Sequence, residues 1–290
     1  MKNAIEFFYK MEFDTIKYFD EQYYLQSSKG KYIFKEYKSR VPFDVLMSTQ
    51  NYYRFHTIIP NSSGEIITFY QGKSYILLRV NLRRDRPITL DDILDVAEIP
   101  LSIPVKNKRT IYSWDKLWQN KIDSFEKYIM NKDNIFNYRE YYDYFIGLSE
   151  NAVAYYKMTD HSNVKIGYSY NRIDSKYTLF DLYDPTNIII SPVMRGISEY
   201  IKSLFFCENK KILIEIEELD VSYNDMKLLI SRLLFPTYFY DIFKKNTNVK
   251  LELEKIINLS PNYEIYLTEI LRAIKKRHEN LPVIRWLNQL

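Results

Sequence analysis

The chain has 290 residues, enough for one large domain or for two lobes with a buried core. Hydrophobic residues make up 46% of it, which excludes an intrinsically disordered chain. Its 41 basic and 37 acidic residues are interspersed, and the net charge of +4 is weaker than the basic footprint of a duplex-binding protein.

The first third of the chain is predicted to form a small antiparallel sheet. Short β-rich runs, several of them separated by Gly-containing turns, cover residues 31–37, 54–59, 65–70 and 75–80. The segment 42–51 lies between these runs and predicts a short helix. We therefore expect one antiparallel sheet with one helix across residues 12–80.

A polar segment follows the predicted strands. Residues 81–88 contain Pro87 and are typical of a linker between two lobes. We expect an N-terminal β-rich lobe over residues 1–82 and a C-terminal helical lobe over residues 83–290. The predicted fold class is therefore α+β, with a small antiparallel lobe followed by a larger, mainly helical lobe.

The rest of the chain changes to helical periodicity. Apolar residues recur at helical spacing over residues 114–129 and about 137–157, which predicts two helices with aromatic core faces. Ser-Pro pairs begin at Ser191 and Ser260, and each is interpreted as an N-cap with Pro at the first helical position. The alternating run KILIEIE, residues 211–217, predicts a strand.

Several classes of site are excluded by residue content. The six glycines form neither a dinucleotide fingerprint nor a P-loop. Cys207 is the single cysteine, so we expect no intrachain disulfide and a reducing, cytoplasmic location. His56, His161 and His278 lack metal-binding spacing, so we expect no transition-metal site. No apolar run is long enough to predict a transmembrane segment.

The order of elements is typical of protein-kinase-like phosphotransferases. A β-rich lobe, a linker and helices precede a strand-loop-strand segment at residues 164–190. Such enzymes hold the nucleotide phosphates with a strand lysine, and they need a catalytic-loop Asp and a metal-binding Asp. The segment YIFKEY resembles their lysine-bearing strand, with Lys35 in the lysine position.

An ordered series of segments extends this resemblance over roughly residues 12–245. The segments are HTIIPNSSGEIITFYQGKSYILLRV, WDKLWQNKIDSFEKY, GLSENAVAYY, YDPTNIIISPVMRGISEYIKSLFF and SRLLFPTYFYDIF. They resemble the spore-coat-associated kinase-like proteins of the aminoglycoside/choline phosphotransferase superfamily. The resemblance implies a bilobal protein-kinase-like fold, with ATP as the one candidate cofactor and Lys35 as its ligand.

The catalytic motifs of that superfamily are degenerate in this chain. The catalytic loop H-G-D-x-x-x-x-N corresponds to GYSYNRIDSK, which has no His and no Asp in place, and Asn171 and Arg172 are the nearest polar residues. The position of the metal-binding Asp falls at Ser191, whose neutral hydroxyl cannot offset the charge of Mg²⁺ as a carboxylate does. The resemblance therefore implies ATP binding that is weak and insensitive to Mg²⁺.

Three acids of the same loop region are candidates for the missing roles. They are Asp174, Asp181 and Asp184, although Asp184 precedes a proline and is typical of a turn. We interpret the chain as a kinase-like pseudoenzyme that binds or scaffolds a protein partner or a small molecule. The alternative is an active small-molecule phosphotransferase, which needs one of these acids to face Lys35. A nucleic-acid-binding module would need clustered basic residues, which the interspersed charges do not provide.

Overall fold

The computed structural model describes residues 1–38, 41–104, 113–130, 139–170, 172–243 and 249–287. The chain divides into two compact units, which are described separately. The first unit comprises Met1–Thr89, Pro100–Pro104 and Lys176–Ile190. The second unit comprises Leu90–Ile99, Val105–Ser175 and Ser191–Leu290. A segment late in the sequence thus belongs to the first unit, whereas the linear boundary at residue 82 stays a prediction.

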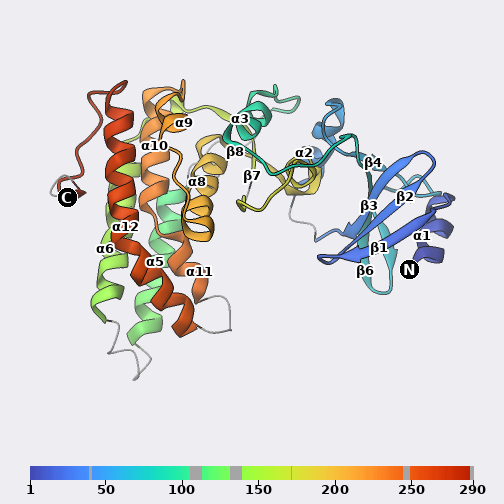
Figure 1. Ribbon diagram of the computed structural model, residues 1–290, viewed down its shortest axis with the longest axis horizontal. Coiled ribbons are helices and arrows are strands. Elements are labelled where there is room, and N and C mark those ends of the chain that lie inside the picture. The colour runs from blue at the N-terminus through green and yellow to red at the C-terminus, as the bar shows by residue number, and fades with distance from the viewer. Residues whose placement is uncertain (39–40, 105–112, 131–138, 171, 244–248, 288–290) are drawn as a thin grey trace. The chain divides into compact units, whose positions relative to one another are not determined.

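The first unit is built on a six-stranded antiparallel sheet (Figure 1). Its strands are β1 (Thr15–Phe19), β2 (Gln22–Ser27), β3 (Gly30–Glu36), β4 (Thr57–Ile59), β5 (Thr68–Tyr70) and β6 (Lys73–Arg79). The order is β1-β2-β3-β6-β4, and β5 also pairs with β6. The predicted antiparallel sheet is confirmed, and β3 lies inside it with hydrogen-bonded neighbours on both sides.

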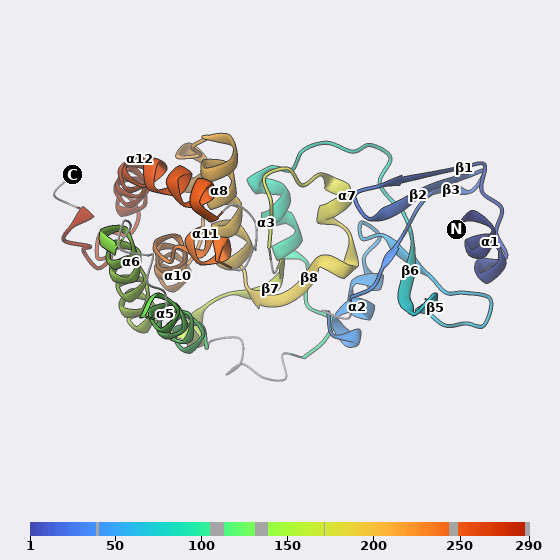
Figure 2. The same cartoon turned by 90° about the horizontal axis from the view of Figure 1, so that it is seen from below.

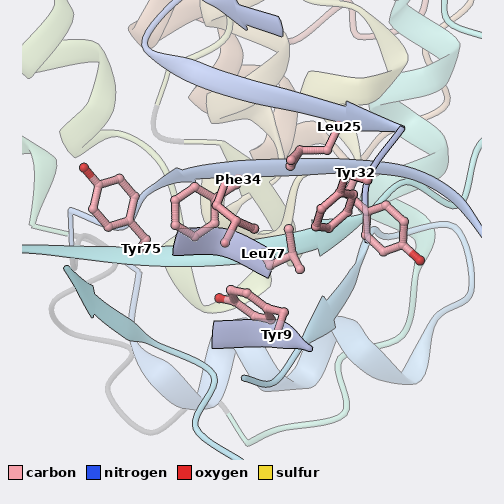
Figure 3. Close-up of a cluster of buried hydrophobic side chains, with 8 residues drawn as sticks. Tyr9, Leu25, Tyr32, Phe34, Tyr75 and Leu77 are labelled. Carbon is pink, nitrogen blue, oxygen red and sulfur yellow. The ribbon is translucent and has the colours of Figure 1, made fainter. Parts of the chain in front are cut away.

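One face of this sheet is covered by an N-terminal helix, α1 (Lys2–Tyr9), which the sequence interpretation did not include. Ile5 and Tyr9 are buried at helical spacing and pack with Tyr32 and Phe34 of β3 in one hydrophobic cluster (Figure 3). The ring of Phe34 stacks on Tyr75 of β6, with 4.8 Å between centroids. Alternate residues of β3 therefore face this core, and the residues between them face the other side of the sheet.

Short elements complete the first unit. They are α2 (Phe43–Ser48), the 3₁₀ turn η1 (Thr49–Asn51), α7 (Leu179–Leu182) and the 3₁₀ turn η4 (Pro185–Asn187). The helix expected over residues 42–51 is thus confirmed as α2 and η1. The strand β8 (Ile188–Pro192) follows η4 and pairs with β7 (Ile166–Tyr170) in a two-stranded sheet.

The second unit is mainly helical (Figure 2). Its helices are α3 (Leu90–Glu98), α5 (Trp114–Met130), α6 (Arg139–Lys157), the 3₁₀ turn η3 (His161–Asn163), α8 (Met194–Glu208), α9 (Ile214–Glu217), α10 (Tyr223–Leu234), α11 (Thr237–Ile242) and α12 (Val249–Lys275). The predicted aromatic core faces are confirmed in large part, since Trp118 stacks on Phe235 at 4.5 Å and Phe145 stacks on Phe239 at 4.2 Å. Tyr141 of the same predicted face is exposed, and Tyr138 lies outside the described residues. No helix in the described part of the chain is both long and apolar enough to cross a membrane.

Three local interpretations of the sequence are wrong. Ser191 does not cap a helix, because the strand β8 runs through it and α8 begins only at Met194. The second Ser-Pro pair lies inside α12, where Pro261 interrupts the hydrogen-bond ladder of a helix that continues on both sides. The run KILIEIE is not a strand: its last four residues form the short helix α9, in which Ile216 is the buried residue.

Candidate functional site around Lys35 and Asp184

Lys35 lies on the central strand β3. It is paired in register with Gln22 of β2 and with Ile76 of β6. Because Tyr32 and Phe34 share the parity that faces the α1 core, the Lys35 side chain leaves the opposite face of the sheet. Only 19% of that side chain is exposed, so its ammonium group needs a partner.

That partner is Asp184, which lies on the segment Lys176–Ile190, and this late segment belongs to the first unit together with the sheet. Backbone hydrogen bonds hold the segment: they run from Ile88 N to Tyr177 O (3.1 Å), from Leu179 N to Arg86 O (3.0 Å) and from His56 N to Tyr183 O (3.0 Å). The loop before α3 and the turn before β4 therefore fix the position of the turn that carries Asp184. Residues that are 149 positions apart in the sequence come into contact in this way.

Lys35 and Asp184 form a largely buried ion pair. The Lys35 Nζ donates to Asp184 Oδ2 at 2.7 Å, and the Asp184 side chain is 5% exposed. The other carboxylate oxygen, Oδ1, accepts from the backbone N and the hydroxyl of Thr186, at 2.8 and 2.7 Å. Burial on its own would raise the pKa of Asp184, but the Lys35 charge and these hydrogen bonds outweigh it and lower the pKa. Asp184 is therefore ionised at neutral pH.

A cavity of about 340 Å³ adjoins this ion pair within the first unit. Two lysines and four acids are among its lining residues: Lys35, Lys38, Asp20, Glu21, Glu36 and Asp181. The excess of acids makes the cavity unsuitable for a highly charged anion that arrives without a cation. Among the described residues, no three His, Cys, Asp or Glu side chains gather closely enough to hold a metal ion by themselves.

Asp181 also lines the cavity, but it has a structural role at the start of α7. Its Oδ2 accepts from the backbone N and the hydroxyl of Thr178, at 2.9 and 3.1 Å, which completes a capping box. Burial raises the pKa of the Asp181 carboxyl. Asn187 reaches back to the same turn, where its Nδ2 donates to the Asp181 carbonyl at 3.1 Å.

His56 lies beside Asp184 and was considered in the sequence only as an unsuitable metal ligand. The residue is 0% exposed, and neither ring nitrogen has a hydrogen-bond partner within the described structure. Its ring packs edge-on against Phe180, with 5.8 Å between centroids. Burial lowers the pKa of His56, and the nearby Asp184 charge opposes this only in part, so the imidazole is neutral at pH 7.

The remaining sequence candidates lie elsewhere. Asp174 is an exposed residue of the second unit. Arg172 also belongs to the second unit and contacts Glu199 at 2.8 Å and Asp241 at 2.6 Å. Asn171 lies outside the described residues. A catalytic role for any of these residues stays a prediction, as does the role of Lys35 in holding a cofactor.

Comparisons with known proteins point to one family and one fold. A family profile described as "Spore coat putative kinase YutH" matches residues 3–270. The endospore coat-associated protein YutH of Bacillus subtilis is 23% identical over 262 residues, which are 78% of this chain and 77% of that protein.

Two solved phosphotransferases are similar to this chain in fold. An aminoglycoside phosphotransferase from Alicyclobacillus acidocaldarius matches with a TM-score of 0.68 at 10% identity, over 95% of this chain and 97% of that one. The AMP-bound spectinomycin phosphotransferase APH(9)-Ia matches with a TM-score of 0.56 at 11% identity, over 94% and 96% of the two chains. At these identities the matches establish the kinase-like fold alone.

Proposed function

The chain belongs to the spore coat kinase family of YutH, and we propose that it is a kinase-like pseudoenzyme that binds a nucleotide at Lys35. In this proposal it acts as a binding or scaffold protein and has little or no phosphotransferase activity. The observation that carries the proposal is the contact between Lys35 and Asp184 beside a cavity. A strand lysine and a nearby acid are the groups that kinase-like proteins place at nucleotide phosphates and their metal ion.

The ion pair sets a condition on the ligand. A phosphate that takes the Lys35 ammonium from Asp184 leaves a buried carboxylate without its cation, which costs free energy. A ligand that brings both an anion for Lys35 and a cation for Asp184 avoids this cost. Mg²⁺ is such a cation, since it prefers carboxylate and phosphate oxygens. We therefore expect ATP binding to depend on Mg²⁺, in contrast to the insensitivity implied by the degenerate motifs alone.

We expect weak catalysis because phosphoryl transfer needs a second acid that is available for catalysis. Phosphoryl transfer needs a carboxylate that orients the attacking hydroxyl, in addition to the metal-binding groups. In the stretch that corresponds to the catalytic loop, Tyr168 and Ser169 are buried on β7 and Arg172 is engaged with two carboxylates. Asp181 is engaged in the capping box of α7. Each 1.36 kcal/mol of lost transition-state stabilisation slows the reaction about tenfold, so the loss of one such group leaves little turnover.

A thermal-shift titration with ATP, with and without Mg²⁺, tests the binding. We expect stabilisation of about 2.7 kcal/mol at a hundredfold excess of Mg·ATP over Kd. Lys35→Ala should abolish the shift. Lys31→Ala is the matched control, because Lys31 lies on the same strand and is exposed. An equal shift in the wild type and in Lys35→Ala would refute nucleotide binding at this lysine.

An active small-molecule phosphotransferase is the second candidate, and one observation favours it. It requires an acid at Lys35, and Asp184 fulfils this requirement at 2.7 Å. Phosphorylation assays with aminoglycosides, spectinomycin and other hydroxyl compounds test it, since the structural neighbours are named for the first two. Mg²⁺-dependent turnover that is lost in both Lys35→Ala and Asp184→Ala would identify the protein as an active phosphotransferase and refute the pseudoenzyme proposal.

The place of action is also a proposal. The name of the Bacillus subtilis relative suggests association with the spore coat, and the single cysteine favours a reducing cytoplasm. We propose cytoplasmic synthesis followed by association with a coat protein partner in a spore-forming host. A fluorescent fusion followed through sporulation tests this. Fluorescence that stays uniform in the cytoplasm to the end of sporulation would exclude coat association.

A further inference from the structure

Two ion pairs adjoin the cavity of the first unit, and they differ in how far solvent reaches them. The pair of Lys35 and Asp184 is largely buried, with side chains that are 19% and 5% exposed. The second pair joins Lys38 Nζ to Glu21 Oε2 at 3.3 Å, and its side chains are 51% and 81% exposed. Both Lys38 and Glu21 line the cavity. The cavity therefore has a second lysine, whose partner is a solvated carboxylate.

The local backbone holds Lys38 and Glu21 at the cavity. Lys38 follows Tyr37, whose backbone N donates to the Ser74 carbonyl at 2.8 Å and whose hydroxyl donates to the Val41 carbonyl at 2.9 Å. Glu21 lies in the two-residue turn that joins β1 to β2, and its φ of 61° is the left-handed conformation that such hairpin turns require. Sheet pairing and turn geometry thus fix both positions without help from a ligand.

The two pairs differ in the cost of separating them. An ion pair exposed to solvent contributes little to stability, so Lys38 leaves Glu21 at low cost. Separating Lys35 from Asp184 costs more, because it leaves a buried carboxylate without its cation. Hydrogen bonds from an ammonium group to phosphate oxygens are charge-assisted and comparatively strong. A phosphate group in the cavity therefore obtains a cation more easily from Lys38 than from Lys35.

We propose that Lys38 is a second phosphate-binding residue of this cavity and that Glu21 is its intramolecular competitor. The inference rests on the proposed nucleotide binding at Lys35 and names a contact that regulates it. Glu21 holds the Lys38 ammonium group until a phosphate group of Mg·ATP takes its place. The released Glu21 carboxylate is then hydrated, since 81% of that side chain is already exposed.

Calorimetric titration with Mg·ATP at constant ionic strength tests the two roles. Lys38→Gln should weaken binding about fivefold, because the phosphate loses a partly exposed ammonium group. Glu21→Gln should tighten binding about twofold to fivefold, because the competitor is removed. Glu65→Gln is the matched control and should bind as the wild type does, since Glu65 is an exposed acid of the same unit that is not among the lining residues of the cavity.

The double variant Glu21→Gln/Lys38→Gln separates competition from general repulsion between charges. If Glu21 acts by occupying Lys38, Glu21→Gln has no effect once Lys38 is replaced. A gain in affinity that is equal in both backgrounds overturns the competition, because Glu21 then repels the nucleotide by its charge alone.

The same titrations distinguish this inference from the proposal on which it rests. Equal affinity of the wild type and Lys38→Gln, together with lost binding in Lys35→Ala, overturns the role of Lys38 and leaves nucleotide binding at Lys35 intact. Weaker binding by Lys38→Gln and tighter binding by Glu21→Gln support the inference. A wild type that shows no saturable binding of Mg·ATP refutes the nucleotide proposal and this inference with it.

Discussion

The contact between Lys35 and Asp184 allows a quantitative test of the site. Asp184→Asn keeps the size of the side chain and its contact with Thr186, but it removes the charge opposite Lys35. Removing one partner of a fully buried pair costs about 3–5 kcal/mol, and Lys35 keeps part of its hydration at 19% exposure. We therefore expect a loss of about 2 kcal/mol in the free energy of unfolding, discounted for that exposure. In a chain of 290 residues, with an unfolding entropy of about 2.1 cal/mol/K per residue, the loss lowers Tm by about 3 °C.

Thermal and urea unfolding measure this loss, with Asp14→Asn as the control because Asp14 is an exposed carboxylate of the same unit. The pKa of Asp184 is lower in the folded state than in the unfolded chain. Its contribution to stability is therefore present above the unfolded pKa of about 4 and is lost as the pH falls through the folded value. A cost that is below about 0.5 kcal/mol at pH 7, or that is unchanged at low pH, would refute a strong ion pair at this site.

Other perturbations test the surroundings of the site and the helical unit. Because burial lowers the pKa of His56, the unfolded chain takes up an extra proton below about pH 6.5. The free energy of unfolding should therefore fall from pH 7 to pH 5. His56→Phe should flatten this pH profile, as measured by urea titrations. A profile of unchanged slope would contradict this. Asp181→Ala removes the capping box of α7 and should cost about 1 kcal/mol by the same measurement. Gly167→Ala should lower Tm, because its Cβ would lie 2.9 Å from a backbone oxygen of Ala97. Gly147→Ala in α6 has open space around the added Cβ and should raise Tm by favouring the helix. Similar Tm shifts in the two variants would argue against these packing environments.

The sequence predicted the sheet and the strand that carries Lys35 because local patterns determine both. Alternation in β3 separates Tyr32 and Phe34, which face the core, from Lys35, which does not, and the neighbouring turns limit how the strands can pair. The aromatic residues of α5 and α6 were likewise predictable from their period of 3.6. Interpretations failed where tertiary packing overrides a local signature, as at Ser191 and Pro261.

The contact that defines the candidate site was not predictable from any local pattern. The turn at Asp184 was correctly expected, since its carboxylate accepts from Thr186 two residues later. That pattern contains no information about which distant side chain the other oxygen meets. The partner is determined by backbone hydrogen bonds from residues 56 and 88 to the segment at 177–183. For the same reason no local pattern indicated that His56 would be buried beside the acid.

The ion pair also determines which measurement distinguishes a nucleotide-binding pseudoenzyme from a protein that retains only the fold. Lys35 and Asp184 neutralise each other, so the pair can hold the segment Lys176–Ile190 to the sheet without any ligand. The presence of Lys35 is therefore compatible with a structural role as well as with phosphate binding. A nucleotide has to outcompete Asp184 for the ammonium group, and it can do so at low cost only with a cation that replaces Lys35 at the carboxylate. The dependence of ATP binding on Mg²⁺, and its loss in Lys35→Ala, consequently separate the two roles, whereas the stability cost of Asp184→Asn is expected for both.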